Sequence, residues 1–156
     1  MSRKSTTKLN FAYATGVPGI DIQHNELFCM CNALQKSLVK MTAPLPDSVY
    51  LSVQDIMKHL KSHCFTEESL LEMIGFPKTA EHKIQHKKLF NLFRRQLRAL
   101  KNKDVSEINS FVSSLRETLI NHVSVSDIEF SVHIETLMAL RKKFNITALK
   151  ARVLTE

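Results

Sequence analysis

Residues 63–86 of the chain read HCFTEESLLEMIGFPKTAEHKIQH, and this stretch decides the fold. It contains two pairs of polar residues four positions apart, His63-x-x-x-Glu67 and His82-x-x-x-His86. Residues four apart on an α-helix differ by about 40° in direction, so each pair projects from one helix face. Between the pairs, Gly75-Phe76-Pro77 is typical of a helix end followed by a residue that cannot continue the helix. The stretch therefore predicts two helices joined by a short turn, each with potential metal ligands on one face.

The helices on either side follow from apolar spacing and from proline. Apolar residues recur at intervals of three, four and seven, which is typical of one buried helix face. Pro44 and Pro46 separate a first helix, at about residues 22–41, from a second helix that Asp47 can cap. Thr79 can cap a third helix in the same way.

A fourth helix is predicted to begin after Asp104. Asp104 and Glu107 have the spacing of a capping box, and the third helix ends just before them, near Asn102. The expected core is formed by the apolar faces of the four helices, namely Ile20, Leu27, Met30, Cys31, Leu34, Leu38, Val49, Val53, Ile56, Leu60, Leu70, Ile74, Ile84, Leu89, Phe90, Phe93, Leu97, Leu100, Ile108, Phe111, Leu115, Leu119 and Val123.

Length and composition favour a single all-α domain. The chain has 156 residues, and with only three glycines and four prolines it has few turns to connect many short strands. Four long helices with short connections predict an up-down-up-down antiparallel four-helix bundle. We expect an N-terminal arm at residues 1–20, the bundle at 21–130 and a basic amphipathic helical extension at 131–156.

The positive charge lies at the two ends of the chain. The net charge is +7, to which residues 1–10 contribute +3 and residues 141–156 contribute +4. Residues 11–140 hold equal numbers of basic and acidic side chains, which argues against nucleic-acid binding by the body of the protein. The basic C-terminal segment is instead a candidate surface for a protein partner or for self-association.

The sequence also predicts a cytoplasmic protein. It has no run of about 18 apolar residues that could span a membrane and no apolar stretch typical of a secretory signal. Its three cysteines, an odd number, indicate free thiols in a reducing compartment.

Further polar candidates lie on the first and fourth helices. His24 lies near the start of the first helix, and His122 precedes Asp127 by five positions on the fourth. Five positions correspond to about 140° on an ideal α-helix, so these two residues share a site only if the helix loosens between them. The intervening Val-Ser-Val-Ser has poor helix propensity. A single histidine is more often structural than a ligand, but here all four helices supply candidates at compatible heights.

Together these motifs resemble those of the hemerythrins, in particular the single-domain bacterial hemerythrins, over about residues 11–130. The matching motifs are Gly19-Ile20-Asp21-x-x-His24, His63-x-x-x-Glu67, Gly75-Phe76-Pro77, His82-x-x-x-His86 and Asn121-His122-x-x-x-x-Asp127. The resemblance implies a non-haem di-iron centre with an oxo or hydroxo bridge. It implies that His82, His86 and His122 hold one iron, that His24 and His63 hold the other, and that Glu67 and Asp127 bridge them.

The resemblance further implies reversible O2 binding, as a hydroperoxide on the iron held by His24 and His63, for oxygen storage, delivery or sensing. No catalytic residue is predicted, and the protein is expected not to be an enzyme. Two alternatives use the same centre: an enzyme that reduces peroxide or nitric oxide, and a regulatory module that responds to redox state, nitric oxide or peroxide. The basic end segment would dock such a module to an acidic partner or another subunit.

Departures from the family pattern concern residues around the centre. His59 lies where bacterial members usually have tyrosine; it is either a residue that supports the ligands or lies at the surface, or one that donates a proton or alters access to the site. Phe11 lies where the family often has tryptophan. The expected apolar lining of the oxygen pocket comprises Leu27, Phe28, Cys31 and Ile120.

Overall fold

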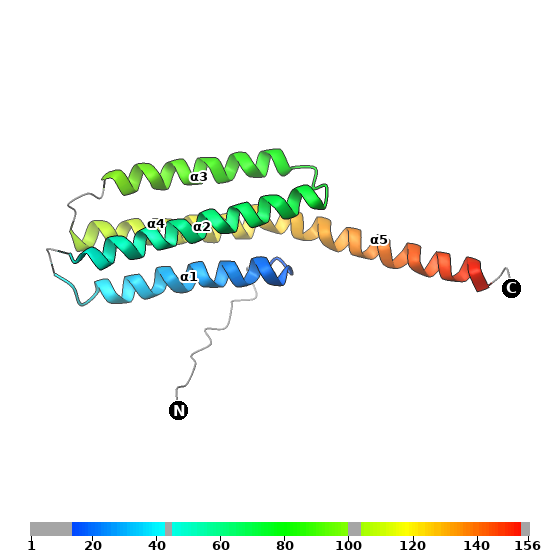
Figure 1. Cartoon of the computed structure of the whole chain (residues 1–156), viewed down its shortest axis with the longest axis horizontal. Helices are drawn as coiled ribbons and strands as arrows, with labels where there is room; N and C mark the ends of the chain where they lie inside the picture. Colours follow the sequence, from blue (N-terminus) through cyan, green and yellow to red (C-terminus); the bar gives the residue numbers. More distant parts are fainter. Residues whose placement is uncertain (1–13, 43–44, 100–103, 154–156) are drawn as a thin grey trace, which may run out of the picture.

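The computed structural model describes residues 14–42, 45–99 and 104–153, with side chains described up to residue 98 in the second range and up to residue 144 in the third. The bundle consists of α1 (Pro18–Leu38), α2 (Asp47–Met73), α3 (Thr79–Ala99) and α4 (Val105–His122). Helices α1 and α3 each pack against both α2 and α4 (Figure 1). The predicted all-α four-helix bundle is therefore confirmed.

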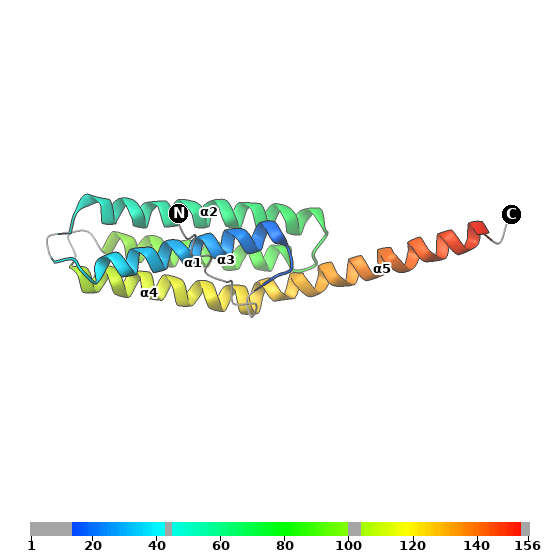
Figure 2. The ribbon, with the colours of Figure 1, turned by 90° about the horizontal axis from the view of Figure 1, so that it is seen from below.

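Helix α4 continues without interruption into a π-helical turn, η2 (Val123–Asp127), and then into α5 (Ile128–Val153). The two views in Figures 1 and 2 show α5 leaving the end of the bundle as a single projecting helix. Its first turns pack on the bundle through Phe130 and Ser131, whereas residues 135–144 are exposed. Among the described residues, no helix has the length and apolar character needed to cross a membrane.

The projecting part of α5 is helical and basic, as expected. Its exposed Leu137, Leu140 and Phe144 are spaced by three and four positions and share one side of the helix, whereas the exposed Met138 lies away from them. Arg141, Lys142 and Lys143 are exposed. The side chains of Lys150 and Arg152, the remaining basic residues of this segment, lie outside the described ones.

The helix-end signals at Gly75 and at Asp104 are confirmed. Gly75 has φ of 63° and ends α2, because only glycine adopts this left-handed conformation without strain. Asp104 accepts a hydrogen bond from the Glu107 backbone N–H at 3.0 Å, and Glu107 accepts one from the Asp104 N–H at 3.2 Å, which completes the capping box. Asp47 and Thr79 are not caps, because each is the first residue of its helix.

The N-terminal segment departs from the expected arm because α1 begins at residue 18 rather than near 22. Pro18 occupies the first turn of the helix, where its fixed φ is favourable. Before it, Thr15 donates hydrogen bonds from its backbone N–H and its hydroxyl to Asp21, at 2.7 and 2.8 Å. The Ser131 hydroxyl donates to the Thr15 carbonyl, so this segment joins α1 to α5. Phe11 lies outside the described residues.

Two apolar clusters flank a layer of buried polar residues. The larger fills the bundle from Leu38 and Val49 to Leu119, and the smaller comprises Ile20, Leu71, Phe76 and Phe130. One core prediction is wrong: Ile84 is 53% exposed, because α3 turns the face of His82 and His86 inward. Leu70 is half-buried and packs against the smaller cluster beside the fully buried Leu71, and Leu100 lies outside the described residues. The polar layer between the clusters lies at the end of the bundle from which α5 projects.

Candidate metal centre

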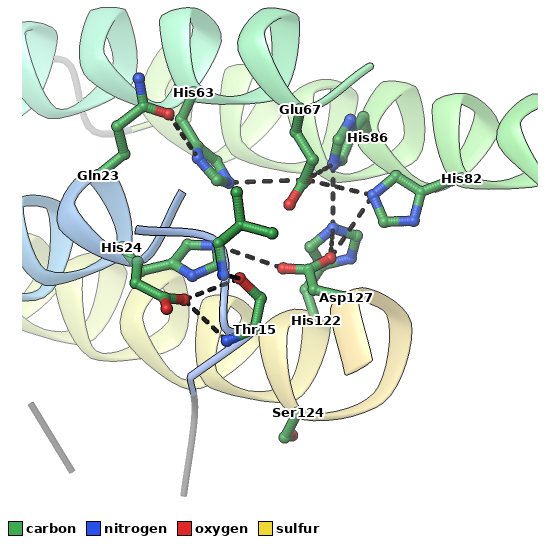
Figure 3. A network of polar contacts seen from close by, with 12 residues as sticks. Thr15, Gln23, His24, His63, Glu67, His82, His86, His122, Ser124 and Asp127 are labelled. Atoms are coloured by element: carbon green, nitrogen blue, oxygen red, sulfur yellow. Dashed lines mark hydrogen bonds and ion pairs between the residues drawn. The ribbon is translucent and has the colours of Figure 1, made fainter. Parts of the chain in front are cut away.

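Seven polar side chains form the buried layer, and they come from every helix of the bundle. Each is at most 9% exposed, and the five histidines surround the two carboxylates (Figure 3). They are His24 on α1, His63 and Glu67 on α2, His82 and His86 on α3, His122 on α4 and Asp127 at the end of η2. The structure thus brings together all seven residues singled out as ligands from the sequence.

The π-turn brings His122 and Asp127 together. A π-turn closes from residue i to i+5, one residue more than an α-turn, so residues five apart project from the same face. Asp127 Oδ1 lies 3.2 Å from His122 Nε2 as a result. The loosening of the helix that the five-residue spacing required is therefore present, over Val123–Asp127.

The seven residues divide into two groups that could each hold a metal ion. One consists of Glu67, His82, His86 and His122, and the other of His24, His63, Glu67 and Asp127. Within each group the potential ligand atoms all lie within 4.8 Å of one another. Glu67 belongs to both groups.

Both carboxylates face both groups. Glu67 Oε2 lies 3.2 Å from Nε2 of His82 and of His86, and 3.7 Å from Nε2 of His63. Asp127 Oδ2 lies 3.3 Å from His24 Nε2, while its Oδ1 lies 3.2 Å from His122 Nε2 and 3.5 Å from His82 Nε2. Asp127 therefore lies beside His82 and His122 of the first group as well as His24 of the second.

Unsatisfied buried atoms show that the donor set fits a metal ion. Glu67 Oε1, both carboxylate oxygens of Asp127 and both ring nitrogens of His24 are buried without a hydrogen bond of good geometry, although Asp127 faces three histidine nitrogens at 3.2–3.5 Å. A buried polar atom without a good partner costs about 1–3 kcal/mol, so this group of atoms favours a compensating partner. A cation bound among these atoms would supply it.

The spacing of two imidazoles supports the same reading. His86 Nε2 and His122 Nε2 lie 3.0 Å apart. Two nitrogen ligands at about 2.1 Å from one metal ion and at a right angle are about 3.0 Å from each other. The two histidines are therefore spaced as neighbouring ligands of one ion.

In the metal-free protein, both ring nitrogens of His86 are protonated at pH 7. Burial lowers the pKa of His86, but its interactions with Cys64 and Glu67 raise it more, to about 11. Burial lowers the pKa of His63 to about 4 and that of His122 to about 3, so both are neutral at pH 7. Burial raises the pKa of Asp127 to about 6, whereas hydrogen bonds from His82 and His86 outweigh burial and hold the pKa of Glu67 below its ordinary value.

Metal affinity is expected to rise with pH because of this proton. A metal ion can bind His86 only after the proton on Nε2 leaves, and the pKa of about 11 means that this proton is present at pH 7. We expect the affinity of the metal-free protein for Zn²⁺ or Co²⁺ to increase about tenfold per pH unit between pH 6.5 and 8. Titrations at three pH values measure the slope, and an affinity independent of pH would contradict the assignment.

The other candidates near the site occupy several environments. His59 lies between α1 and α2, with Nε2 at 3.1 Å from Glu26 Oε2, and is 29% exposed. Leu27 and Cys31 are fully buried in the larger cluster, Phe28 packs against that cluster and Ile120 is half-buried. Burial raises the pKa of the Cys31 thiol to about 11, which keeps it protonated. The lining of an oxygen pocket by Leu27, Phe28, Cys31 and Ile120 stays a prediction.

Two hydrogen-bond partners of the histidines were missed in the sequence. His63 Nδ1 donates to Gln23 Oε1 at 3.2 Å, and His86 Nδ1 donates to Glu68 Oε1 at 2.8 Å. Both partners directly adjoin a ligand in the chain, but their spacing has no feature that separates them from solvent-facing polar residues.

Comparison with models of known protein families gives no match, and comparison with curated proteins gives no relative.

Proposed function

We propose that this protein is hemerythrin-like: it holds two iron ions in the buried polar layer and binds O2 reversibly, for storage, delivery or sensing. The observation that carries the proposal is the pair of adjacent ligand groups that share Glu67, with imidazole Nε2 atoms and both carboxylates directed inward. The motifs of the sequence support the same assignment.

The donor set favours iron. Imidazole binds zinc, copper, iron and nickel, and carboxylates widen the set toward harder cations, so a mixed site suits iron. In this assignment His82, His86 and His122 would hold one ion, His24 and His63 would hold the other, and Glu67 and Asp127 would be shared. Iron bound there would supply the redox chemistry for reversible O2 binding.

The residues around the centre would determine its charge, its access to water and the position of His24. Five neutral ligands and two carboxylates give the centre less negative charge than carboxylate-rich sites, which favours reversible binding over cleavage of the O–O bond. An apolar cluster on each side shields the polar layer from water, and His122 also lines an open pocket with Gln85 and Thr118. The contact of Thr15 with Asp21 and Ser131 holds the start of α1, and with it His24, against α5.

The proposal is tested by metal analysis and spectroscopy of the purified protein. We expect two irons per chain and, after anaerobic reduction, a visible charge-transfer band that appears with O2 and disappears when O2 is removed. The absence of this band in a protein loaded with two irons would contradict O2 binding. Turnover of peroxide or nitric oxide with a reductant, far faster than autoxidation, would assign the centre to an enzyme instead.

A further inference from the structure

The two ligand groups differ in the charge of the residue behind one histidine. In the first group, His86 Nδ1 donates to the carboxylate of Glu68, at 2.8 Å. In the second, His63 Nδ1 donates to the side-chain amide oxygen of Gln23, at 3.2 Å (Figure 3). One ligand therefore has an anionic partner and the other a neutral one.

Both hydrogen bonds fix the same ring orientation. A carboxylate and an amide oxygen can only accept, so each Nδ1 carries a proton and Nε2 is the nitrogen that a metal ion would bind. In His86, Nε2 faces Glu67 and His122 at 3.2 and 3.0 Å. In His63, Nε2 faces Glu67 at 3.7 Å. The two partners therefore play one geometric role, and the difference between them is charge.

The charge of the residue that accepts a hydrogen bond from Nδ1–H changes how strongly Nε2 binds a metal ion. A carboxylate that accepts from Nδ1–H draws the proton toward itself and makes Nε2 a stronger electron donor. Such a donor stabilises a cation, and it stabilises the more highly charged oxidation state most. Glu68 is 27% exposed, so solvent screens only part of its charge.

We propose that Glu68 and Gln23 make the two metal positions unequal. Glu68, acting through His86, raises the affinity of the position formed by His82, His86 and His122 and favours iron(III) there. Gln23, acting through His63, leaves the other position the more readily reduced of the two. Both are positioning residues, and the inference rests on the proposed two-metal function.

The test exchanges charge while keeping an oxygen acceptor in each place. We compare Glu68→Gln and Gln23→Glu with Glu72→Gln, which removes a carboxylate one turn further along α2 and 61% exposed. Each metal-free protein is titrated with Co²⁺, and the paramagnetically shifted ring N–H signals of His86 and His63 report which position fills. This readout requires neither iron nor O2.

Glu68→Gln is expected to weaken Co²⁺ binding at the His86 position by about tenfold, the lower end of the effect of such partners, and to leave the His63 position unchanged. Gln23→Glu is expected to strengthen the His63 position. With iron, the reduction equilibrium of the His86 position should shift about tenfold toward iron(II) in Glu68→Gln, which is about 59 mV for one electron.

The outcomes separate the inference from the proposed function. Wild-type protein that binds fewer than two Co²⁺ would contradict the two-metal function itself. Two bound ions with the same affinities in Glu68→Gln and Glu72→Gln would overturn the inference and leave the function intact, and so would a Gln23→Glu variant whose His63 position is no stronger than in the wild type.

Discussion

Glutamine in place of Glu67 is expected to leave the protein unable to hold two metal ions. Glu67 is fully buried, and its Oε2 atom lies within 3.7 Å of histidines from both ligand groups. Glutamine has almost the same volume but is neutral and offers one oxygen instead of two. Removing a residue that hydrogen-bonds to a metal ligand lowers metal affinity by about 10–100-fold. Removing a ligand shared by both ions should therefore lower metal affinity by more than about 100-fold.

Metal content after dialysis and Co²⁺ titration measure this effect, with Glu72→Gln as the control for a carboxylate lost from α2. Helical content and thermal unfolding of the metal-free variants verify that the bundle still forms. A Glu67→Gln protein that retains two ions with wild-type affinity would show that Glu67 is not a shared ligand.

The second large effect is expected from the length of the π-turn. Inserting one alanine between Ser124 and Val125 would place His122 and Asp127 six positions apart, and neither an α-turn nor a π-turn brings such residues together. It would also rotate α5 by about 100°, moving Phe130 away from Phe76, whose ring centroid lies 6.4 Å from its own. We expect loss of metal binding through Asp127 and a stability loss of about 3–5 kcal/mol, as for truncation of a buried phenylalanine.

Deletion of Val125 is the matched variant. Val125 is 58% exposed, and without it His122 and Asp127 are four positions apart, so an ordinary α-turn places them on one face. We therefore expect the deletion to keep both metal ions and most of the stability. Metal content and thermal unfolding of the two variants check the pair, and equal behaviour of insertion and deletion would contradict this role of the turn.

Helix ends were predictable where the residue type has a specific structural role at a helix end. Glycine at position 75 adopts positive φ, and Asp104 with Glu107 satisfies two backbone N–H groups, so both signals were right. Asp47 and Thr79 were less informative, because an acidic residue is also favourable within the first turn and because the Thr79 hydroxyl donates to the Phe76 carbonyl instead of accepting from the helix. Apolar character alone predicts Ile84 in the core, but His82 and His86 occupy the inner face of α3 and leave Ile84 exposed.

The ligands were predictable because spacing constrains them, and their partners were not. His63 with Glu67 and His82 with His86 each repeat after one helical turn, and the structure places all four in the buried layer. Gln23 and Glu68 contact ligands of neighbouring helices, so their position depends on how the helices pack rather than on spacing within one helix.

Asp127 connects the buried polar layer directly to the projecting helix α5. Asp127 is the last residue of η2, and α5 follows at once and projects beyond the bundle. A helix of 26 residues is about 39 Å long at about 1.5 Å per residue. A tilt of about 5° at the π-turn would therefore displace the far end by about 3 Å. Because Phe130 and Ser131 hold the first turns of α5 on the bundle, such a tilt would require their contacts with Phe76 and Thr15 to shift together with Asp127.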